Sequence, residues 1–146
     1  VITGDNAETT KAIALQAGIV NTTPAVNGTE IVGNTEDEII TIAQRTMLFT
    51  RMFPDVKLAV VNALKKSGEV VAMLGDGVND GPALKAAHIG VAMGNKGTEI
   101  AKSAAALVIT NDDLQKLIVG IAAGRRIYSN IKKAVQYIFP FIFPLF

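Results

Sequence analysis

Hydrophobic positions follow two different patterns, and the change lies near residue 112. Before that point, short apolar runs alternate with segments in which apolar residues recur every three or four positions. Short apolar runs are typical of buried strands, and the longer spacing is typical of amphipathic helices. Strands that alternate with helices predict a parallel sheet with right-handed helical crossovers. The first part of the chain is therefore expected to have an α/β fold.

End signals place the elements of this first part. Asn6, Thr35 and Pro54 are typical first residues of helices, and Gly18 is a typical stop. The continuously apolar run 70–74 predicts a strand buried on both faces. The predicted helices cover 7–17, 35–46, 54–66, 81–87 and 97–105, and the predicted strands cover 19–20, 47–50, 70–74, 89–93 and 107–109.

The second part of the chain keeps a single helical spacing. Apolar residues recur at intervals of three and four from Leu114 to Ile138. This pattern predicts one amphipathic helix over 113–139, about 40 Å long at a rise of 1.5 Å per residue. Because such a helix is longer than a small sheet is wide, we expect it to project from the rest of the fold.

Composition excludes several classes of function. The 146 residues suit one domain, 49% of them are hydrophobic, and they include no cysteine and one histidine. These numbers exclude a disordered chain, a disulfide scaffold, a cysteine nucleophile and a metal centre built from cysteines or several histidines. The net charge of +1 argues against a nucleic-acid partner.

This small net charge hides a division along the chain. Residues 1–113 carry 9 Lys and Arg against 13 Asp and Glu, whereas residues 114–146 carry 5 Lys and Arg and no acid. Cations gather on the cytoplasmic side of membrane helices, and a span needs about 20 apolar residues. The final segment, 134–146, is apolar but has only 13 residues. We therefore predict a basic stalk helix at 113–133 and the truncated start of a transmembrane helix, in contact with lipid, at 134–146.

The strongest chemical signal directly follows the apolar run 70–74. Asp76 and Asp80 stand four residues apart in Gly-Asp-Gly-Val-Asn-Asp at 75–80. Ligands of open α/β sheets bind beyond the carboxyl ends of the strands, and two carboxylates with room for water suit Mg²⁺. The alternative is an acidic turn in which Asp80 caps the next helix.

Two weaker patterns also follow apolar strands. Thr3, Gly4 and Asp5 offer a hydroxyl and backbone amides before a helix, which together can bind an anion. Arg51 and Lys57 offer cations that can neutralise phosphoryl charge. Taken alone, the first pattern is more typical of a helix cap and the second of a pair of solvated cations. Taken together with the carboxylates, they predict a phosphoryl-transfer site at one edge of one sheet.

In combination, these motifs resemble the P-type cation-transporting ATPases of the haloacid dehalogenase-like superfamily. The resemblance covers nearly the whole chain and is weakest over 20–46. It implies an incomplete three-layer Rossmann-like parallel sheet, with 1–112 as the C-terminal portion of the phosphorylation domain. The motifs that carry it are Thr-Gly-Asp-Asn at 3–6, Arg-x-x-Pro-x-x-Lys at 51–57, Gly-Asp-Gly-Val-Asn-Asp-Gly-Pro-Ala-Leu at 75–84, IGVAMGNKGTEIAK at 89–102 and GRRIYSNIKKAVQYI at 124–138.

The resemblance implies roles for the residues that match the first two motifs. Thr3 and Gly4 would contact the phosphoryl group, with Thr3 taking part in catalysis. Asp5 would lie toward the nucleotide, and Arg51 near the ATP phosphates. Lys57 would be catalytic, because its ammonium would balance the charge of the phosphoryl group and of the acceptor carboxylate.

The same reasoning assigns the Gly-Asp-Gly-Val-Asn-Asp motif. Asp76 and Asp80 would be Mg²⁺ ligands, Asp80 would also be catalytic, and Asn79 would help to bind phosphate. The acceptor aspartate of the family lies in an Asp-Lys-Thr-Gly-Thr motif on the central strand, and this sequence does not contain that motif. We therefore expect the chain alone to lack turnover, and to be poorly stable without its central strand.

The implied parent protein is an ATP-driven, multi-pass membrane pump for Ca²⁺ or a related cation. Residues 1–133 would be cytoplasmic, the cation sites would lie outside this chain, and the missing domains of the same pump would be its partners. Two alternatives remain. A soluble phosphatase of the superfamily is disfavoured by the basic stalk and the phenylalanine-rich end, and the other alternative is an inactive module that binds Mg²⁺ or phosphate.

Overall fold

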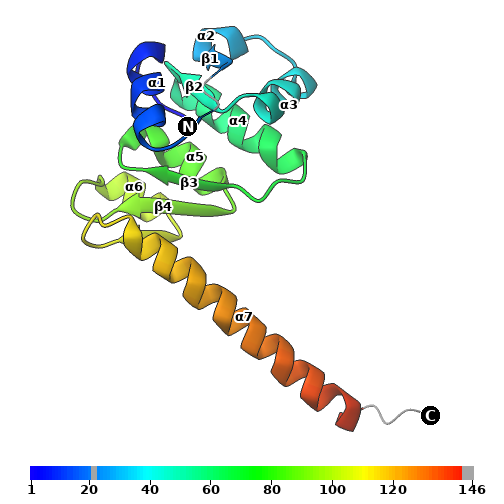
Figure 1. Cartoon of the computed structure of the whole chain (residues 1–146). Coiled ribbons are helices and arrows are strands. Elements are labelled where there is room, and N and C mark those ends of the chain that lie inside the picture. Colours follow the sequence, from blue (N-terminus) through cyan, green and yellow to red (C-terminus); the bar gives the residue numbers. More distant parts are fainter. Residues whose placement is uncertain (21–22, 143–146) are drawn as a thin grey trace.

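The computed structural model describes residues 1–20 and 23–142, and it confirms an α/β fold with parallel strands and a long C-terminal helix (Figure 1). The strands of this part form two small sheets instead of one. One sheet pairs β1 with β2, and the other has the order β3-β4-β5; every pairing is parallel. The strands are β1 (Ala25–Asn27), β2 (Leu48–Thr50), β3 (Ala72–Gly75), β4 (Ile89–Met93) and β5 (Leu107–Ile109).

The five helices predicted in the first part are all present, and their ends follow local capping. The Asn6 side chain accepts a hydrogen bond from the Thr9 backbone N–H at 2.9 Å, which caps the first helix. Pro54 is the first residue of its helix, where a missing N–H costs little. The helices are α1 (Ala7–Gln16), α2 (Gly28–Ile31), α3 (Glu36–Arg45), α4 (Pro54–Lys66), α5 (Gly81–Ala86), α6 (Glu99–Ala104) and α7 (Gln115–Ile142), with a 3-10 turn η1 (Val78–Asp80) before α5.

Thr35, which the sequence predicts as the start of a helix, forms a capping pair with Glu38 at the N-terminal end of α3. The Glu38 carboxylate accepts a hydrogen bond from the Thr35 backbone N–H at 2.7 Å and another from the Thr35 hydroxyl at 2.9 Å. These bonds favour the ionised carboxylate, the backbone bond most, and they hold the pKa of Glu38 below its ordinary value. The N-terminal end of α3 is therefore fixed by its own sequence.

One predicted strand is wrong. Residues 19–20 form no strand, and Val20 is 85% exposed. The strand is instead β1, which lies in a turn-rich segment and pairs with β2 through Val26 opposite Phe49. A strand of three residues is selected by its partner more than by its own propensity. Asn27 and Glu30 cap the short helix α2 in this region, where the sequence pattern predicts no helix.

Two hydrophobic clusters form the core, and α4 belongs to both. In the first cluster, Val56, Val60 and Ala63 of α4 pack with β2 and α3, and Ile2 is packed against them. In the second, Val61 of α4 packs with residues of β3, β4, α5 and α6. Because α4 contributes to both clusters, it fixes one sheet relative to the other and places Lys57 near both.

The strand β3 differs from its prediction in burial. Met73 and Gly75 are buried, whereas Ala72 and Leu74 are exposed, and Leu74 keeps 42% of its surface. The buried face packs on α5, while the other face has no helix of the described chain over it. β3 is also an edge strand, because it pairs only with β4. The continuous apolar run indicated a central strand, whereas the described residues place a neighbour on only one side of β3.

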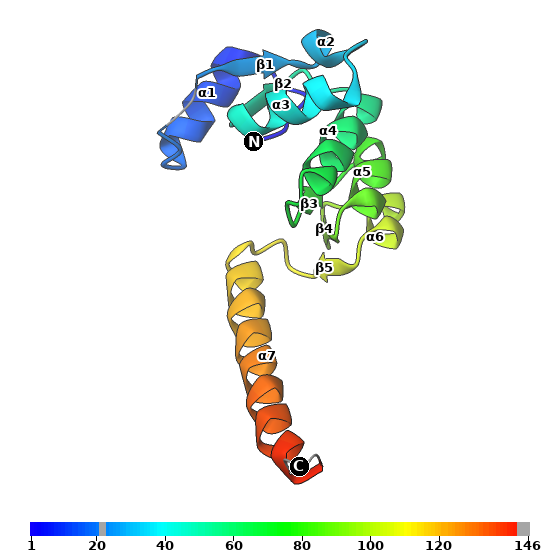
Figure 2. The same ribbon diagram turned by 90° about the vertical axis from the view of Figure 1, so that its right-hand side faces the viewer.

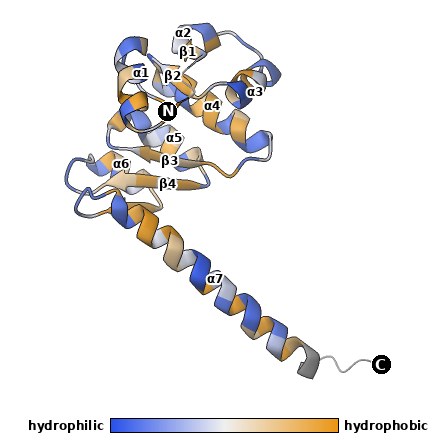
Figure 3. Cartoon of the chain, viewed as in Figure 1, coloured by the Kyte–Doolittle hydropathy of each residue, from blue (hydrophilic) through white to orange (hydrophobic). Residues whose placement is uncertain are grey.

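Helix α7 projects away from both sheets, as predicted (Figures 1 and 2). Every residue from Ile118 to Phe139 is exposed. Hydrophobic and hydrophilic residues alternate along its length (Figure 3). Within the described residues, no helix is both long and apolar enough to cross a bilayer. Residues 143–146 of the predicted membrane segment lie outside that description.

Candidate functional site

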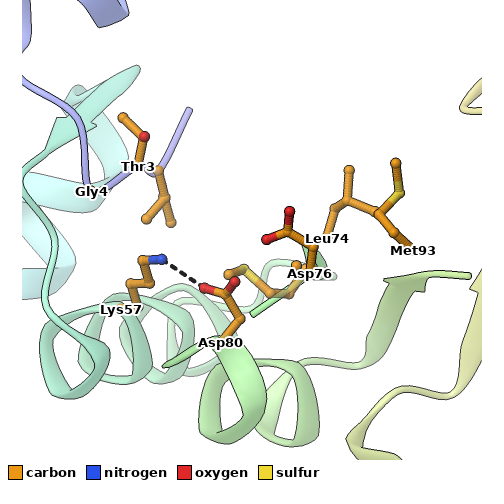
Figure 4. A pocket seen from close by; sticks show the side chains of 10 residues that line it. Thr3, Gly4, Lys57, Leu74, Asp76, Asp80 and Met93 are labelled. Carbon is orange, nitrogen blue, oxygen red and sulfur yellow. Dashed lines mark hydrogen bonds and ion pairs between the residues drawn. The ribbon is translucent and has the colours of Figure 1, made fainter. Parts of the chain in front are cut away.

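A pocket of about 370 Å³ lies between the two sheets, at the carboxyl ends of their strands. One wall is the segment Ile2–Gly4, which runs beside β2, and the other is the end of β3 with the loop that follows it (Figure 4). Its lining includes five residues that the sequence assigned to the site, namely Thr3, Gly4, Lys57, Asp76 and Asp80. The predicted convergence of the three motifs is thus observed for these five.

Lys57 reaches the pocket from the first turn of α4. Its ammonium donates a hydrogen bond to the Asp80 carboxylate, with 2.6 Å between Nζ and Oδ1. The two side chains retain 13% and 11% of their exposure, so the pair is largely withdrawn from water. The other Asp80 oxygen accepts from the Gly77 backbone N–H at 3.3 Å. Both carboxylate oxygens of Asp80 are therefore hydrogen-bonded, one to Lys57 and the other to the turn between β3 and α5.

Asp76 is the first residue after β3 and lies exposed at the mouth of the pocket (Figure 4). Its backbone carbonyl accepts a hydrogen bond from the Thr98 N–H at 2.8 Å. No hydrogen bond or ion pair joins its carboxylate to another described residue. This carboxylate is thus the one in the pocket that is available to a cation, whereas the Asp80 carboxylate is already occupied.

Backbone hydrogen bonds to the end of β2 hold the segment Thr3–Asp5. The Thr3 N–H donates to the Phe49 carbonyl and the Thr3 carbonyl accepts from the Met52 N–H, both at 3.0 Å. The Thr3 hydroxyl donates to the Asp5 carboxylate at 3.2 Å. A side chain at Gly4 would meet no atom within 4 Å, so the pocket is open above this residue.

Three predicted site residues do not line this pocket. Arg51 lies in a separate cleft of about 510 Å³ with Asn6, Thr50 and Asn27. Its φ of +48° is a conformation that few residues other than glycine adopt, and its N–H donates to the Asp5 carbonyl at 2.9 Å. Asp5 lines a further cleft, together with Thr10, Ile13 and Ala14 of α1.

Asn79 is exposed in η1, on none of the clefts described here. The pocket does contain a residue that the motifs did not single out. Met93 ends β4, the strand beside β3, and contributes its side chain to the wall (Figure 4). The rule that ligands bind at carboxyl ends of parallel strands applies to β4 as well, and it was the signal that could have identified Met93.

Electrostatics and donor chemistry both favour a cation in this pocket. Two carboxylates and one ammonium give the lining a formal charge of −1, which attracts cations. Among the described residues there is no group of three or more His, Cys, Asp or Glu that could hold a metal. One free carboxylate suits Mg²⁺, which keeps several waters and shares its remaining positions with phosphate oxygens. It does not suit a metal that needs a complete protein cage.

Comparison with known proteins gives one family and many relatives. The haloacid dehalogenase-like hydrolase family matches residues 1–88. The chain is 41% identical over 140 residues to "Calcium-transporting ATPase 1" of Lactococcus lactis and 44% identical over 138 residues to the human "Calcium-transporting ATPase type 2C member 1". These alignments cover 95% and 94% of this chain but only 16% and 15% of the two relatives.

A solved structure supports the same placement. A zinc-transporting PIB-type ATPase in the E2.Pi state superposes with a TM-score of 0.68 and 30% sequence identity. The superposition covers 92% of this chain and 18% of that protein. The likeness therefore extends over both small sheets and into the projecting helix, but it concerns a small part of a much longer chain.

Proposed function

The chain belongs to the haloacid dehalogenase-like hydrolases, in the branch of the P-type cation-transporting ATPases, and we propose that it supplies the Mg²⁺- and phosphate-binding half of a pump's phosphorylation site. The single observation that carries this proposal is the pocket that unites Thr3, Gly4, Lys57, Asp76 and Asp80 from three separate motifs. ATP-driven transport would belong to the whole pump. This chain aligns with only 16% and 15% of the length of the two relatives named above.

Asp76 would hold Mg²⁺ in this scheme. Its carboxylate is exposed at the pocket mouth and has no partner among the described residues, which fits a metal that takes few protein ligands. Mg²⁺ bound there would offset the negative charge that develops on phosphate oxygens. Asp80 remains a candidate second ligand, but it would first have to release Lys57 or share an oxygen with it.

Lys57 would stabilise the phosphoryl group by its charge. Asp80 holds the ammonium in the pocket, so little reorganisation is needed when an anion arrives. The Thr3 hydroxyl and the backbone at Gly4 would orient phosphoryl oxygens from the opposite wall. For this, the Thr3 hydroxyl has to turn away from the Asp5 carboxylate, to which it now donates. Catalysis of this kind consists mainly of positioning and electrostatics.

The acceptor would come from a strand that is absent from this sequence. Among the described residues, the segment at Ile2 pairs with β2 on one side only, and β3 pairs with β4 on one side only. Both open sides border the pocket. One parallel strand between them would join the two sheets, cover Leu74 and carry an aspartate next to Lys57. Unpaired strand edges of this kind are otherwise a liability.

The remaining assignments concern ATP and the membrane. Arg51 would bind the polyphosphate of ATP from its neighbouring cleft, with Asp5 and Asn79 supporting the turns on either side. Helix α7, with its five cations, would lead toward anionic lipid at the cytoplasmic face of the membrane. We propose Ca²⁺ as the transported ion because both sequence relatives above are named calcium-transporting ATPases. Calcium uptake by vesicles that contain the whole pump checks this choice.

A Mg²⁺ titration of the 146-residue chain tests the metal-binding half of the proposal. In amide NMR spectra we expect saturable shifts at Asp76, Gly77 and Thr98, and the variant Asp76→Asn is expected to lose them. Asp37→Asn is the matched control, because Asp37 is an exposed acid on α3, outside the pocket. Equal Mg²⁺ shifts in the wild-type chain and in Asp76→Asn would refute the assignment of this carboxylate.

A further inference from the structure

The direction of α7 depends on a short segment at its root. Every residue from Ile118 to Phe139 is exposed, so the body of this helix is not buried against the two sheets. The root begins after β5, where Asp112 has a φ of +57° and its N–H donates to the Ile109 carbonyl at 3.1 Å. A non-glycine residue in this conformation is uncommon and costs energy, so the surrounding contacts must hold it there.

The Asp112 side chain makes those contacts. Its Oδ1 accepts a hydrogen bond from the Asn95 backbone N–H at 2.9 Å, and its Oδ2 accepts from the Lys96 N–H at 3.0 Å. Two successive amides that point to one carboxylate form a concave anion-binding nest, and such charge-assisted bonds are among the stronger ones in proteins. The root of α7 is thus bound to the loop 94–98, which is remote from it in sequence.

That loop also supports the pocket. It begins next to Met93, which lines the pocket, and it ends at Thr98, whose N–H donates to the Asp76 carbonyl at 2.8 Å. Its first residue is fixed as well, because the Gly94 N–H donates to the Ile109 carbonyl at 2.8 Å. A side-chain carbon at Gly94 would lie 2.6 Å from that carbonyl oxygen, so this close approach of the loop to β5 requires glycine.

We propose that Asp112 is a positioning residue that fixes the start of α7 relative to Asp76. The connection runs from the Asp112 carboxylate through the loop 94–98 to the backbone of Asp76. The role of this connection in the pump rests on the proposed function of Asp76. The hydrogen bonds that form the connection do not depend on that function. A displacement of the loop on cation binding at Asp76 changes the direction of α7 through Asp112.

Amide exchange in the 146-residue chain tests the local connection. The variant Asp112→Gly keeps a residue at ease with positive φ and removes both acceptors. We expect exchange at Asn95 and Lys96 to become about tenfold faster, with Gly94 unchanged as the internal reference, because the lost bonds are local. Asp112→Asn, which keeps one oxygen, is expected to give a smaller acceleration.

The neighbouring acid provides the matched control. Asp113 caps α7 through a hydrogen bond from the Gln115 N–H at 3.0 Å, and its carboxylate accepts no hydrogen bond from the loop 94–98. Asp113→Ala is expected to leave exchange at Asn95 and Lys96 unchanged. Equal acceleration at Gly94 in Asp112→Gly would overturn the proposal, because it would assign Asp112 to general stability. Unchanged exchange at Asn95 and Lys96 would overturn it as well.

The direction of α7 supplies a second readout. The sequence has no cysteine, so spin labels at Lys85→Cys on α5 and Lys132→Cys on α7 are specific. We expect Asp112→Gly to broaden the distribution of label distances and Asp113→Ala to leave it narrow. Equal widths in all three chains would contradict a positioning role.

Mg²⁺ alone then separates this inference from the proposed function. In the wild-type chain, Mg²⁺ is expected to shift the amides of Gly77 and of Gln115 and Lys116 together. In Asp112→Gly, only the shift at Gly77 should remain. If Mg²⁺ shifts neither region in the wild-type chain, the proposed function fails, while the exchange and distance measurements still decide the role of Asp112. A shift at Gln115 that persists in Asp112→Gly would overturn the inference.

Discussion

Asp80→Ala is expected to lower the free energy of unfolding by about 3 kcal/mol, because it leaves the Lys57 ammonium without its counter-charge. The ion pair measures 2.6 Å and its two side chains keep only 13% and 11% of their exposure. An ammonium in such a place cannot recover its full hydration when the carboxylate is removed. Urea unfolding of the 146-residue chain, followed by circular dichroism, measures the change.

Two further variants identify the cause of that loss. Combining Lys57→Met with Asp80→Ala removes the unpaired charge and is expected to restore most of the stability. Glu36→Ala breaks the ion pair between Glu36 and Lys66, whose side chains are 49% and 61% exposed, and should cost less than about 1 kcal/mol. If Asp80→Ala costs no more than Glu36→Ala, the pocket pair is not buried in the way described.

Gly75→Ala is expected to damage both stability and the site. A side-chain carbon at Gly75 would lie 2.6 Å from the Cβ of Asp80 and 2.9 Å from its Cγ. Gly75 ends β3 and Asp80 ends η1, so only a short turn separates them. To relieve the clash, the Asp80 carboxylate has to move away from Lys57. Overpacking of this kind costs about 1–3 kcal/mol, and displaced polar groups add to it. Urea unfolding and the Mg²⁺ titration are both expected to show the loss.

Gly77→Ala is the matched control in the same turn. Its nearest contact would be 3.7 Å from the Asp80 carboxylate, which is an ordinary van der Waals distance. Its backbone N–H still donates to Asp80 after the substitution. We expect Gly77→Ala to be neutral or slightly stabilising, because alanine restricts the unfolded chain. Equal effects of Gly75→Ala and Gly77→Ala would show that close packing against Asp80 does not set the site.

Much of the fold could be predicted because its helices carry their own end signals. Asn6 caps α1, Thr35 and Glu38 cap α3, and Pro54 begins α4, and each of these contacts is local. β1 could not be predicted, because three residues carry too little pattern and the pairing partner lies more than twenty positions away. The strand β1 forms because it pairs with β2, and local sequence does not specify that pairing.

The burial of β3 could not be predicted for a different reason. A continuous apolar run such as 70–74 indicates neighbours on both sides, but the sequence cannot show whether those neighbours are part of the same chain. In the structure, β3 is an edge strand and Leu74 is exposed. The apolar run taken alone indicated a fully paired strand, whereas the family resemblance implied an incomplete sheet without its central strand.

The site was predictable as far as it depends on strand ends. Thr3, Lys57 and Asp76 follow or flank strands that run in the same direction, so their convergence followed from topology. Arg51 follows β2 just as directly, but its positive φ and its hydrogen bond to the Asp5 carbonyl place it in the neighbouring cleft. Such a backbone turn leaves no signal in residue spacing.

Asn79 shows the same limit at closer range. It stands beside Asp80, yet it is exposed while Asp80 is buried. The ion pair with Lys57 draws Asp80 inward, and the adjacent residue of a tight turn then points elsewhere. The motif predicts a site role for both Asn79 and Asp80. Only the ion pair of Asp80 with Lys57 of α4 determines which of them lies in the pocket.

The most direct test of the central claim is the phosphoenzyme formed by the whole pump that contains this chain. With radiolabelled ATP and Mg²⁺, we expect acid-stable, hydroxylamine-labile label in the wild-type pump, a loss of at least about a hundredfold in Asp76→Asn, and wild-type label in the control Asp37→Asn. The loss follows because the Mg²⁺ contribution to charge stabilisation is worth several kcal/mol, and 1.36 kcal/mol is a factor of ten in rate. Wild-type rates and levels of label in Asp76→Asn would contradict the claim that this pocket is the Mg²⁺ and phosphate half of the site.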